Sequence, residues 1–163
     1  MIDSDFKEIE KFRKSFEQLQ KDMPSIISRY AVAEGVYFVR KAKEATNNKK
    51  KVATSNYLRS WGSDKKPYIS GNTYIIGVGN TADYALYLEK GFRAHFVPGR
   101  WINKRFVYDK EAKTGMFVGG KKGNVVRGNW IMLLAKKQTE QTQEKRLKSK
   151  CLSELRKRFG VFR

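Results

Sequence analysis

Cysteine and histidine are almost absent from the sequence. The 163 residues include one cysteine, Cys151, and one histidine, His95. One cysteine cannot form a disulfide within the chain, and a structural zinc ion needs a cluster of cysteine and histidine ligands that two residues cannot supply. We therefore expect a protein that folds in a reducing compartment and holds no metal ion and no cofactor.

Long hydrophobic runs are absent as well. The longest apolar run spans residues 130–135, whereas a helix needs about 18 apolar residues to cross a bilayer. The N-terminal residues are acidic, where a secretory signal peptide is basic. We expect synthesis in the cytosol and no membrane partner.

The residues that catalysis needs do not occur in suitable patterns. His95 is the one side chain suited to act as a base near neutral pH, and no Gly-x-Ser-x-Gly motif accompanies it. Asp83 and Glu89 are six residues apart in a short predicted helix, so they fall on different faces. A nuclease needs clustered acids, which the basic second half of the chain lacks. The sequence therefore predicts a protein without catalytic residues, which is not an enzyme.

Negative charge is scarce. The chain has 35 lysines and arginines against 16 aspartates and glutamates, a net charge of +19. Residues 92–163 hold 19 of the basic residues and 5 of the acidic ones, so this half makes most of the field. Such a field favours a nucleic acid, an anionic membrane or an acidic protein surface as partner. Our candidates for docking charges are Lys121, Lys122 and Arg127.

Apolar residues are plentiful enough for a folded core, at 40% of a chain whose length fits one domain. They recur at steps of three and four over residues 4–23, and again from Pro24 to about residue 45. Because proline suits the first turn of a helix, this pattern predicts two helices that meet at a break near Met23 and Pro24. In residues 129–159 the apolar residues recur at helical spacing, except in a polar stretch in the middle. This pattern predicts two helices or one long helix that crosses a subunit boundary.

A short helix and a strand are predicted in the central part of the chain. Thr54 can cap a helix over residues 56–61, since its hydroxyl can accept from the free N–H groups of the first turn. Alternating apolar residues over residues 73–78 predict one strand, and glycine-asparagine pairs at residues 71–72 and 79–80 predict a turn at each end.

A second short helix is predicted over residues 82–90. Asn80 or Thr81 can cap it, and Gly91 stands where a helix often ends in a left-handed residue. Glu89 lies near the C-terminal end, where negative charge is disfavoured. We expect Glu89 either to pair with an arginine or lysine across a subunit boundary, or to be an ordinary exposed glutamate.

The sequence indicates secondary structure less clearly in the segment beyond this helix. We expect residues 92–100 to be irregular, with a turn at residues 98–99. Residues 105–108 and 116–118 predict two strands that pair as a hairpin. The basic glycine-rich loop at residues 119–124 lacks the spacing of a phosphate-binding P-loop, so we expect no nucleotide there.

Together these elements predict an α+β fold. We expect a single domain of residues 1–163, with a small antiparallel or mixed sheet, packed helices, and long N-terminal and C-terminal helices. The N-terminal helices would occupy residues 1–45, the α+β core residues 54–128, and a helical extension residues 129–163.

Three motifs of the core occur in a fixed order. Residues 54–61 read Thr-Ser-Asn-Tyr-Leu-Arg-Ser-Trp, residues 76–80 read Ile-Gly-Val-Gly-Asn, and residues 83–91 read Asp-Tyr-Ala-Leu-Tyr-Leu-Glu-Lys-Gly. Their order and spacing, followed by a loop that contains a proline, resemble a family of small phage morphogenesis proteins. This family includes tail-completion and head-to-tail joining (neck) proteins, with relatives in contractile phage-tail-like bacteriocins. The residues that carry the resemblance are Thr54, Leu58, Arg59, Ser60, Trp61, Tyr84, Ala85, Tyr87, Glu89, Gly91 and Pro98.

The resemblance implies a structural subunit without catalytic residues. It implies a homo-oligomeric ring or collar, hexameric to match the tail, that completes the tail end and joins it to neck, tube or sheath proteins. Such a head-to-tail connector would assemble in the bacterial cytoplasm, become part of the virion or tail-like particle, and contact DNA in the lumen without sequence specificity. The charge leaves a second interpretation open, a basic nucleic-acid-binding module. Its stacking aromatics would be Trp101, Phe106, Tyr108 and Phe117.

Overall fold

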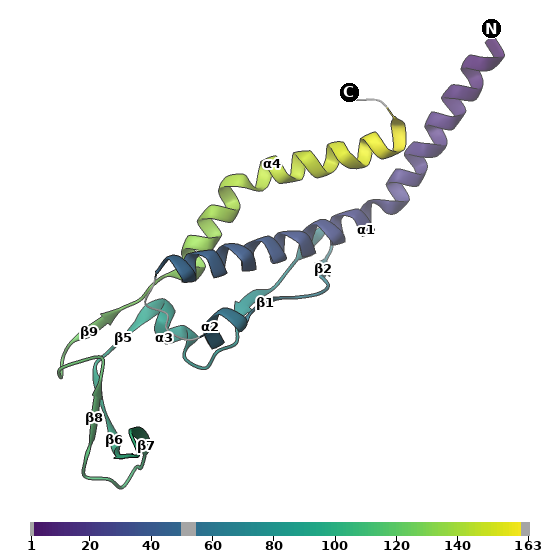
Figure 1. Ribbon diagram of the computed structural model, residues 1–163. Helices are drawn as coiled ribbons and strands as arrows, with labels where there is room; N and C mark the ends of the chain where they lie inside the picture. The colour runs from purple at the N-terminus through teal and green to yellow at the C-terminus, as the bar shows by residue number, and fades with distance from the viewer. Residues whose placement is uncertain (1, 50–54, 161–163) are drawn as a thin grey trace. The chain divides into compact units, whose positions relative to one another are not determined.

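The computed structural model describes residues 2–49 and 55–160, with side chains from residue 6 onward, so Thr54 lies outside the described residues. The chain forms two compact units (Figure 1). Unit 1 comprises Met1–Thr81 and Leu133–Arg163, and unit 2 comprises Ala82–Met132. Helices and small antiparallel sheets build the chain, and long helices lie near both ends, so the predicted α+β fold is confirmed. The single domain stays a prediction.

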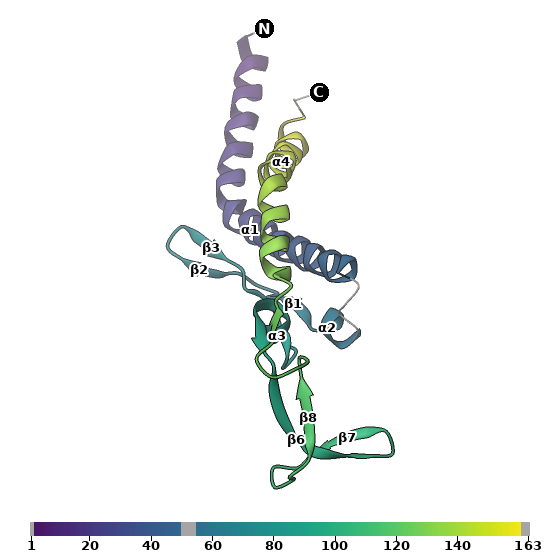
Figure 2. The ribbon, with the colours of Figure 1, turned by 90° about the vertical axis from the view of Figure 1, so that its left-hand side faces the viewer.

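The N-terminal part of unit 1 is one helix, α1 (Ile2–Asn48), with Pro24 inside it. The predicted break at Pro24 is therefore wrong. A proline within a helix removes one backbone hydrogen bond and costs about 3 kcal/mol, but it can bend the helix without ending it. Figures 1 and 2 show that α1 bends along its length. Contacts with the C-terminal helix on both sides of Pro24 support one continuous helix.

The C-terminal helix, α4 (Ile131–Phe159), is also continuous, which confirms one of the two forms that the sequence allowed. It runs antiparallel to α1 within unit 1 (Figure 1). Phe12 of α1 meets Phe159 near the end of α4, and Tyr37 of α1 meets Thr142 nearer its start. The polar gap in the sequence of α4 therefore supplies contacts to α1. That α4 crosses a subunit boundary stays a prediction.

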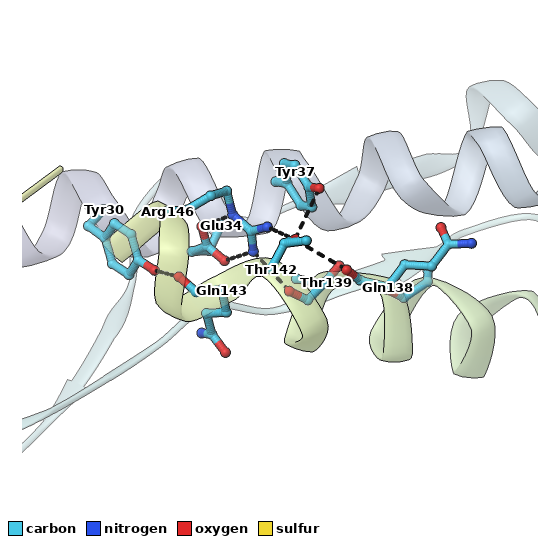
Figure 3. Close-up of polar contacts among 9 residues, drawn as sticks. Tyr30, Glu34, Tyr37, Gln138, Thr139, Thr142, Gln143 and Arg146 are labelled. Atoms are coloured by element: carbon cyan, nitrogen blue, oxygen red, sulfur yellow. Dashed lines mark hydrogen bonds and ion pairs between the residues drawn. The ribbon is translucent and has the colours of Figure 1, made fainter. Parts of the chain in front are cut away.

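A cluster of polar side chains joins α1 to α4 (Figure 3), and we call it the clamp. The Arg146 guanidinium donates to the Glu34 carboxylate twice, from Nε to Oε1 at 2.7 Å and from Nη2 to Oε2 at 2.6 Å. It also donates to the Thr139 carbonyl at 3.0 Å and to the Thr142 hydroxyl, and it lies over the Tyr37 ring at 3.6 Å. Because Arg146 and Glu34 are 21% and 12% exposed, their bidentate pair is shielded from solvent and strong.

A second set of contacts ties the end of α4 to α1. Arg158 donates to the Asp22 carboxylate at 2.6 Å, and the Phe159 ring lies 5.1 Å from Phe12 and 5.8 Å from Phe16. The hydrogen bond from Arg158 lowers the pKa of Asp22. Asp22 therefore stays ionised, and its pair with Arg158 stays intact, at a lower pH than a free aspartate would allow.

The core of unit 1 lies where helix α2 (Ser55–Arg59) meets strand β1 (Trp61–Ser63). Tyr57 is 0% exposed and Trp61 4%, and their rings meet edge to face at 5.7 Å. Asn80 Nδ2 donates to the Tyr57 carbonyl at 2.8 Å, and the Thr81 N–H donates to the Ser60 carbonyl at 3.0 Å. Asn80 and Thr81 therefore hold α2 in place, and their prediction as caps of the next helix is wrong.

A hairpin extends from this core, and its two arms pair in two separate sections. Strand β1 pairs with β4 (Val78–Asn80), and β2 (Tyr68–Ser70) pairs with β3 (Thr73–Ile75). The predicted turn at residues 71–72 is confirmed, and Gly71 has a φ of +56° there. The turn predicted at residues 79–80 is wrong, because both residues belong to β4.

The single strand predicted over residues 73–78 is also wrong, because Ile76 and Gly77 separate β3 from β4. The N–H of Gly77 donates to the Asp64 carboxylate at 2.9 Å, and its carbonyl accepts from the Asp64 N–H at 2.9 Å. A Cβ at residue 77 would lie 2.5 Å from Asp64 Oδ2. Asp64 thus bonds to residue 77 where the ladder is interrupted, and a side chain at residue 77 would require the Asp64 carboxylate to move.

Unit 2 is built around one strand, β6 (His95–Ile102). The first half of β6 pairs with β8 (Gly115–Val118), and its second half pairs with β7 (Arg105–Tyr108). Two predictions are wrong here, since residues 92–100 are not irregular, and β7 and β8 pair with β6 rather than with each other. Pro98, which has no N–H to donate, lies where the partner of β6 changes, a place where a strand accepts proline.

A short helix and a second strand pair complete unit 2. Helix α3 (Ala85–Lys90) confirms the helix predicted over residues 82–90, although it is shorter. Gly91 ends α3 with a φ of +82° and begins β5 (Gly91–Arg93), which pairs with β9 (Val125–Arg127). A Cβ at residue 91 would lie 2.1 Å from the Val126 carbonyl oxygen, so both the backbone angle and the strand pairing require glycine.

We expect Tyr57→Ala and Trp61→Ala to destabilise unit 1 strongly. Each change removes a large buried ring from the core, which typically costs about 3–5 kcal/mol in the free energy of unfolding. Thermal unfolding followed by circular dichroism measures the loss. Tyr68→Ala is the matched control, because Tyr68 is 69% exposed. Equal melting temperatures for all three variants would show that Tyr57 and Trp61 do not form the core.

We expect Arg146→Gln to lower the free energy of unfolding by about 3 kcal/mol, because it leaves the shielded Glu34 carboxylate without its partner. Lys145→Gln removes the same charge from the neighbouring exposed position and should change stability by less than about 0.5 kcal/mol. Chemical denaturation of both variants gives the comparison. A loss no larger in Arg146→Gln than in Lys145→Gln would contradict a stabilising role for the clamp.

Candidate assembly surfaces

An apolar stripe on the N-terminal half of α1 is exposed. It consists of Phe6, Ile9, Phe12 and Phe16, which are between 56% and 67% exposed. Their spacing of three and four residues places them on one face of the helix. Phe159 contacts Phe12 and Phe16, and the stripe remains open to solvent for most of its area. An exposed apolar surface of this continuity marks an interaction site.

An apolar groove of about 690 Å³ continues the stripe within unit 1. Leu19 and Met23 of α1 line it, and they follow Phe16 at steps of three and four residues. Its other walls include Tyr74 from β3 and Leu147 from α4. Sequence periodicity indicates the apolar face of each helix, but it gives no sign that the two faces leave a space between them.

Exposed apolar side chains also occur on both faces of the β7–β6–β8 sheet of unit 2. Trp101 and Tyr108 are each 63% exposed on one face, and Phe96 and Phe117 are 46% and 45% exposed on the other. The Trp101 ring meets Phe106 at 5.5 Å. This sheet therefore leaves aromatic side chains partly exposed on both of its faces within unit 2.

The predicted docking charges are accessible. Lys121 and Lys122 lie in the loop before β9, Arg127 lies in β9, and all three are exposed. Positive φ angles at Gly119, Gly120 and Gly123 shape this loop. The loop is a short basic turn next to a strand pair, which is an accessible position for electrostatic contacts.

The residues that carry the family resemblance belong mostly to the framework of each unit. Trp61 is buried, and Arg59 and Tyr87 are exposed. The half-buried members are Leu58, Ser60, Tyr84, Ala85, Glu89, Gly91 and Pro98. Tyr57 is buried more completely than any of these, and sequence reasoning missed it. The signal was the four-residue step from Tyr57 to Trp61, which in a helix, as predicted for residues 56–61, would bring the two aromatic rings to the same face.

Glu89 has a role that the sequence did not indicate. Both carboxylate oxygens accept the N–H of Met132, at 3.2 and 3.1 Å, in the first turn of α4. The Trp130 N–H donates to the Glu89 carbonyl at 3.2 Å, and the Asn129 N–H donates to the Leu88 carbonyl at 2.8 Å. The first turn of α4 contains no acidic residue of its own. Glu89 therefore supplies the negative charge that a helix N-terminus favours.

The described part of the chain offers no arrangement suited to metal chemistry. Among residues 2–49 and 55–160, no group of three or more His, Cys, Asp or Glu side chains could hold a metal ion. His95 is exposed, and its Nδ1 lies 3.1 Å from the Arg93 carbonyl oxygen. The same residues include no helix with the length and hydropathy needed to span a bilayer. The accessible features of both units are apolar and cationic surfaces, which suit binding to other macromolecules.

Comparison with known proteins identifies the family. A family model described as "Bacteriophage HK97-gp10, putative tail-component" matches residues 10–91, half of the chain. No curated protein and no solved structure matches the chain. The matched region runs from the apolar stripe of α1 through α2 and the hairpin to the end of α3, so it includes the motifs at residues 54–61, 76–80 and 83–91. The chain therefore belongs to the HK97-gp10-like family of phage tail components, and its role is that of a structural protein of the tail.

Proposed function

We propose that this protein is a ring or collar subunit that completes the end of a phage tail, or of a phage-tail-like particle, and joins it to neighbouring neck, tube or sheath proteins. Membership of a tail-component family supports a place in the tail. The observation that carries the finer proposal is the apolar stripe of Phe6, Ile9, Phe12 and Phe16, which one copy of the chain leaves largely exposed. Burial of an apolar surface of this kind against a neighbour is favourable in water, and such surfaces mark interaction sites.

Contacts between copies in a ring would use two different surfaces of each subunit. Such heterologous contacts form a closed ring when the rotation between copies is right, and six copies would match the symmetry of a tail. The four stripe side chains expose about 450 Å² in all, whereas a stable interface buries about 800 Å² on each partner. The apolar groove of unit 1 is the natural surface to supply the remainder.

The proposed subunit acts by binding alone and has no catalytic step. Glu89, one of the two central carboxylates considered for catalysis, is engaged with the backbone of α4. The subunit would assemble in the bacterial cytoplasm and become part of the particle. Its basic surface would face acidic tail proteins, with contacts to DNA in the lumen that are weak and independent of sequence.

The position in the particle can be tested by imaging. Particles assembled without this protein should lack a ring at one end of the tail, and the full-length protein carrying an electron-dense label should restore density there. Label found along the whole tail, or no binding to the particle, would contradict a tail-end ring.

We expect Phe6→Ser combined with Ile9→Ser to prevent ring formation without unfolding the chain, because the change removes apolar contact area that lies on the surface. Light scattering of the purified protein measures the oligomer. The matched control is Glu8→Ser with Lys11→Ser, which changes two exposed polar residues of the same turns. A ring that forms equally well in both double variants would show that the stripe is not the contact.

We expect replacement of Lys121, Lys122 and Arg127 by glutamine to weaken incorporation into particles, because it removes three exposed charges that favour an acidic surface. Binding of duplex DNA should stay weak and sensitive to salt, with a dissociation constant of roughly 10⁻⁴ to 10⁻⁶ M at physiological salt. A mobility-shift titration measures this constant. Much tighter DNA binding that the triple variant abolishes would instead favour a nucleic-acid-binding module.

A further inference from the structure

We propose that one face of the β7–β6–β8 sheet binds another tail protein whose contact surface has an apolar centre and carboxylates around it. We call this the docking face, and its residues are Phe96, Arg100, Ile102, Arg105, Val107 and Phe117. The proposal rests on the proposed function, in which the subunit joins the tail to a neighbouring component.

The strand register places these six residues together on one face. Phe96 pairs with Phe117 across β6 and β8, and side chains at paired positions point to the same side of a sheet. Arg100 pairs with Val107, and Ile102 with Arg105, across β6 and β7. Phe96, Arg100 and Ile102 are separated by even steps along β6, so all three pairs share a face.

The apolar members of the docking face are accessible. Phe96, Ile102, Val107 and Phe117 are between 44% and 49% exposed. Phe96 and Phe117 meet edge to face with ring centroids at 5.5 Å, which fixes the two rings relative to each other. An exposed apolar patch with ordered aromatic rings is what the centre of a protein interface requires.

Both arginines of the three strands belong to this face. Arg100 donates to the Asp109 carboxylate at 2.6 Å. Arg105 is exposed and has no ion pair with any residue that the structure describes. The opposite face has no lysine or arginine at its strand positions. The docking face therefore combines an apolar surface with an uncompensated cation, to which a carboxylate of a partner is complementary.

The charge of unit 2 argues against a second copy as the occupant. Ala82–Met132 contains 10 lysines and arginines and 4 aspartates and glutamates, a net charge of +6. Pairing this face with itself would bring Arg105 of both copies to one interface, and juxtaposed like charges oppose association. A negatively charged partner would bind this face without such repulsion.

The apolar composition argues against DNA. Interfaces with DNA are more polar than interfaces between proteins, and their contacts go mainly to phosphates. Ile102 and Val107 are aliphatic and offer no ring for base stacking, and the Phe96 and Phe117 rings pack against each other. A protein with carboxylates around an apolar patch satisfies both the charge and the apolar area.

Binding to particles assembled without this protein tests the proposal. Purified full-length protein is added to such particles, the particles are sedimented, and the bound fraction is measured from 0.05 to 0.3 M NaCl. We expect Arg105→Glu and Val107→Asp each to reduce binding at least tenfold at low salt. Lys66→Glu, the same change of charge at an exposed position in unit 1, should bind like the unmodified protein. Far-UV circular dichroism and melting temperatures check that the variants are folded.

The outcomes separate this proposal from the proposed function. If the unmodified protein does not bind the particles, the proposed function fails. If it binds, and folded Arg105→Glu and Val107→Asp bind equally well, the docking face is wrong while the proposed function stands. Binding that salt does not weaken would contradict an acidic partner. Lower affinity of Arg105→Glu for a 20-base-pair DNA duplex, with unchanged particle binding, would assign the face to DNA.

Discussion

The ion pair between Glu34 and Arg146 is the interaction on which the helical part of the molecule depends. It joins α1 to α4 beyond Pro24, while Arg158 and Asp22 join them just before it. The proline therefore lies between two ties to the same neighbouring helix, and these ties favour the continuation of α1 past Pro24. The antiparallel pairing also decides which surfaces stay open. Phe159, the last residue of α4, packs against Phe12 and Phe16, whereas Phe6 and Ile9 are exposed among the residues that the structure describes.

Four carboxylates hold the backbone of the chain or arginines of α4. Glu34 and Asp22 bind arginines of α4, Asp64 accepts the N–H of Gly77, and Glu89 accepts the N–H of Met132. Other carboxylates, among them Glu44 and Glu140, pair with lysines, but 16 acidic residues cannot balance 35 basic ones. The excess of positive charge is thus displayed outward, and the same residues that stabilise the units leave a strong field for a partner.

The helices could be predicted from the sequence, because apolar residues at helical spacing indicate the buried face of each helix. Whether two such segments form one continuous helix could not be predicted. The apolar steps before and after Pro24 were correctly assigned to helix, but the contacts that make them one helix come from residues over a hundred positions away. The prediction of which strands pair was wrong for a similar reason. The segments at residues 105–108 and 116–118 look like a hairpin because they are adjacent in sequence, whereas both pair with β6, which Pro98 and Gly99 had marked as a turn. Glu89 shows the same limit, since its carboxylate binds a helix that begins forty residues later.

The family match includes Phe12 and Phe16 of the apolar stripe and ends before the sheet of unit 2. The match ends at residue 91, where β5 begins, so the β7–β6–β8 sheet and α4 lie beyond it. Within the match lie α2 and the hairpin, with the buried pair of Tyr57 and Trp61, and these elements build a scaffold. Beyond it, unit 2 carries apolar side chains on both faces of a small sheet together with a net positive charge. An exposed apolar surface of this kind marks an interaction site, and its positive charge favours an acidic partner. The matched region therefore contains the buried pair of Tyr57 and Trp61, while the docking face that we propose lies in residues beyond it.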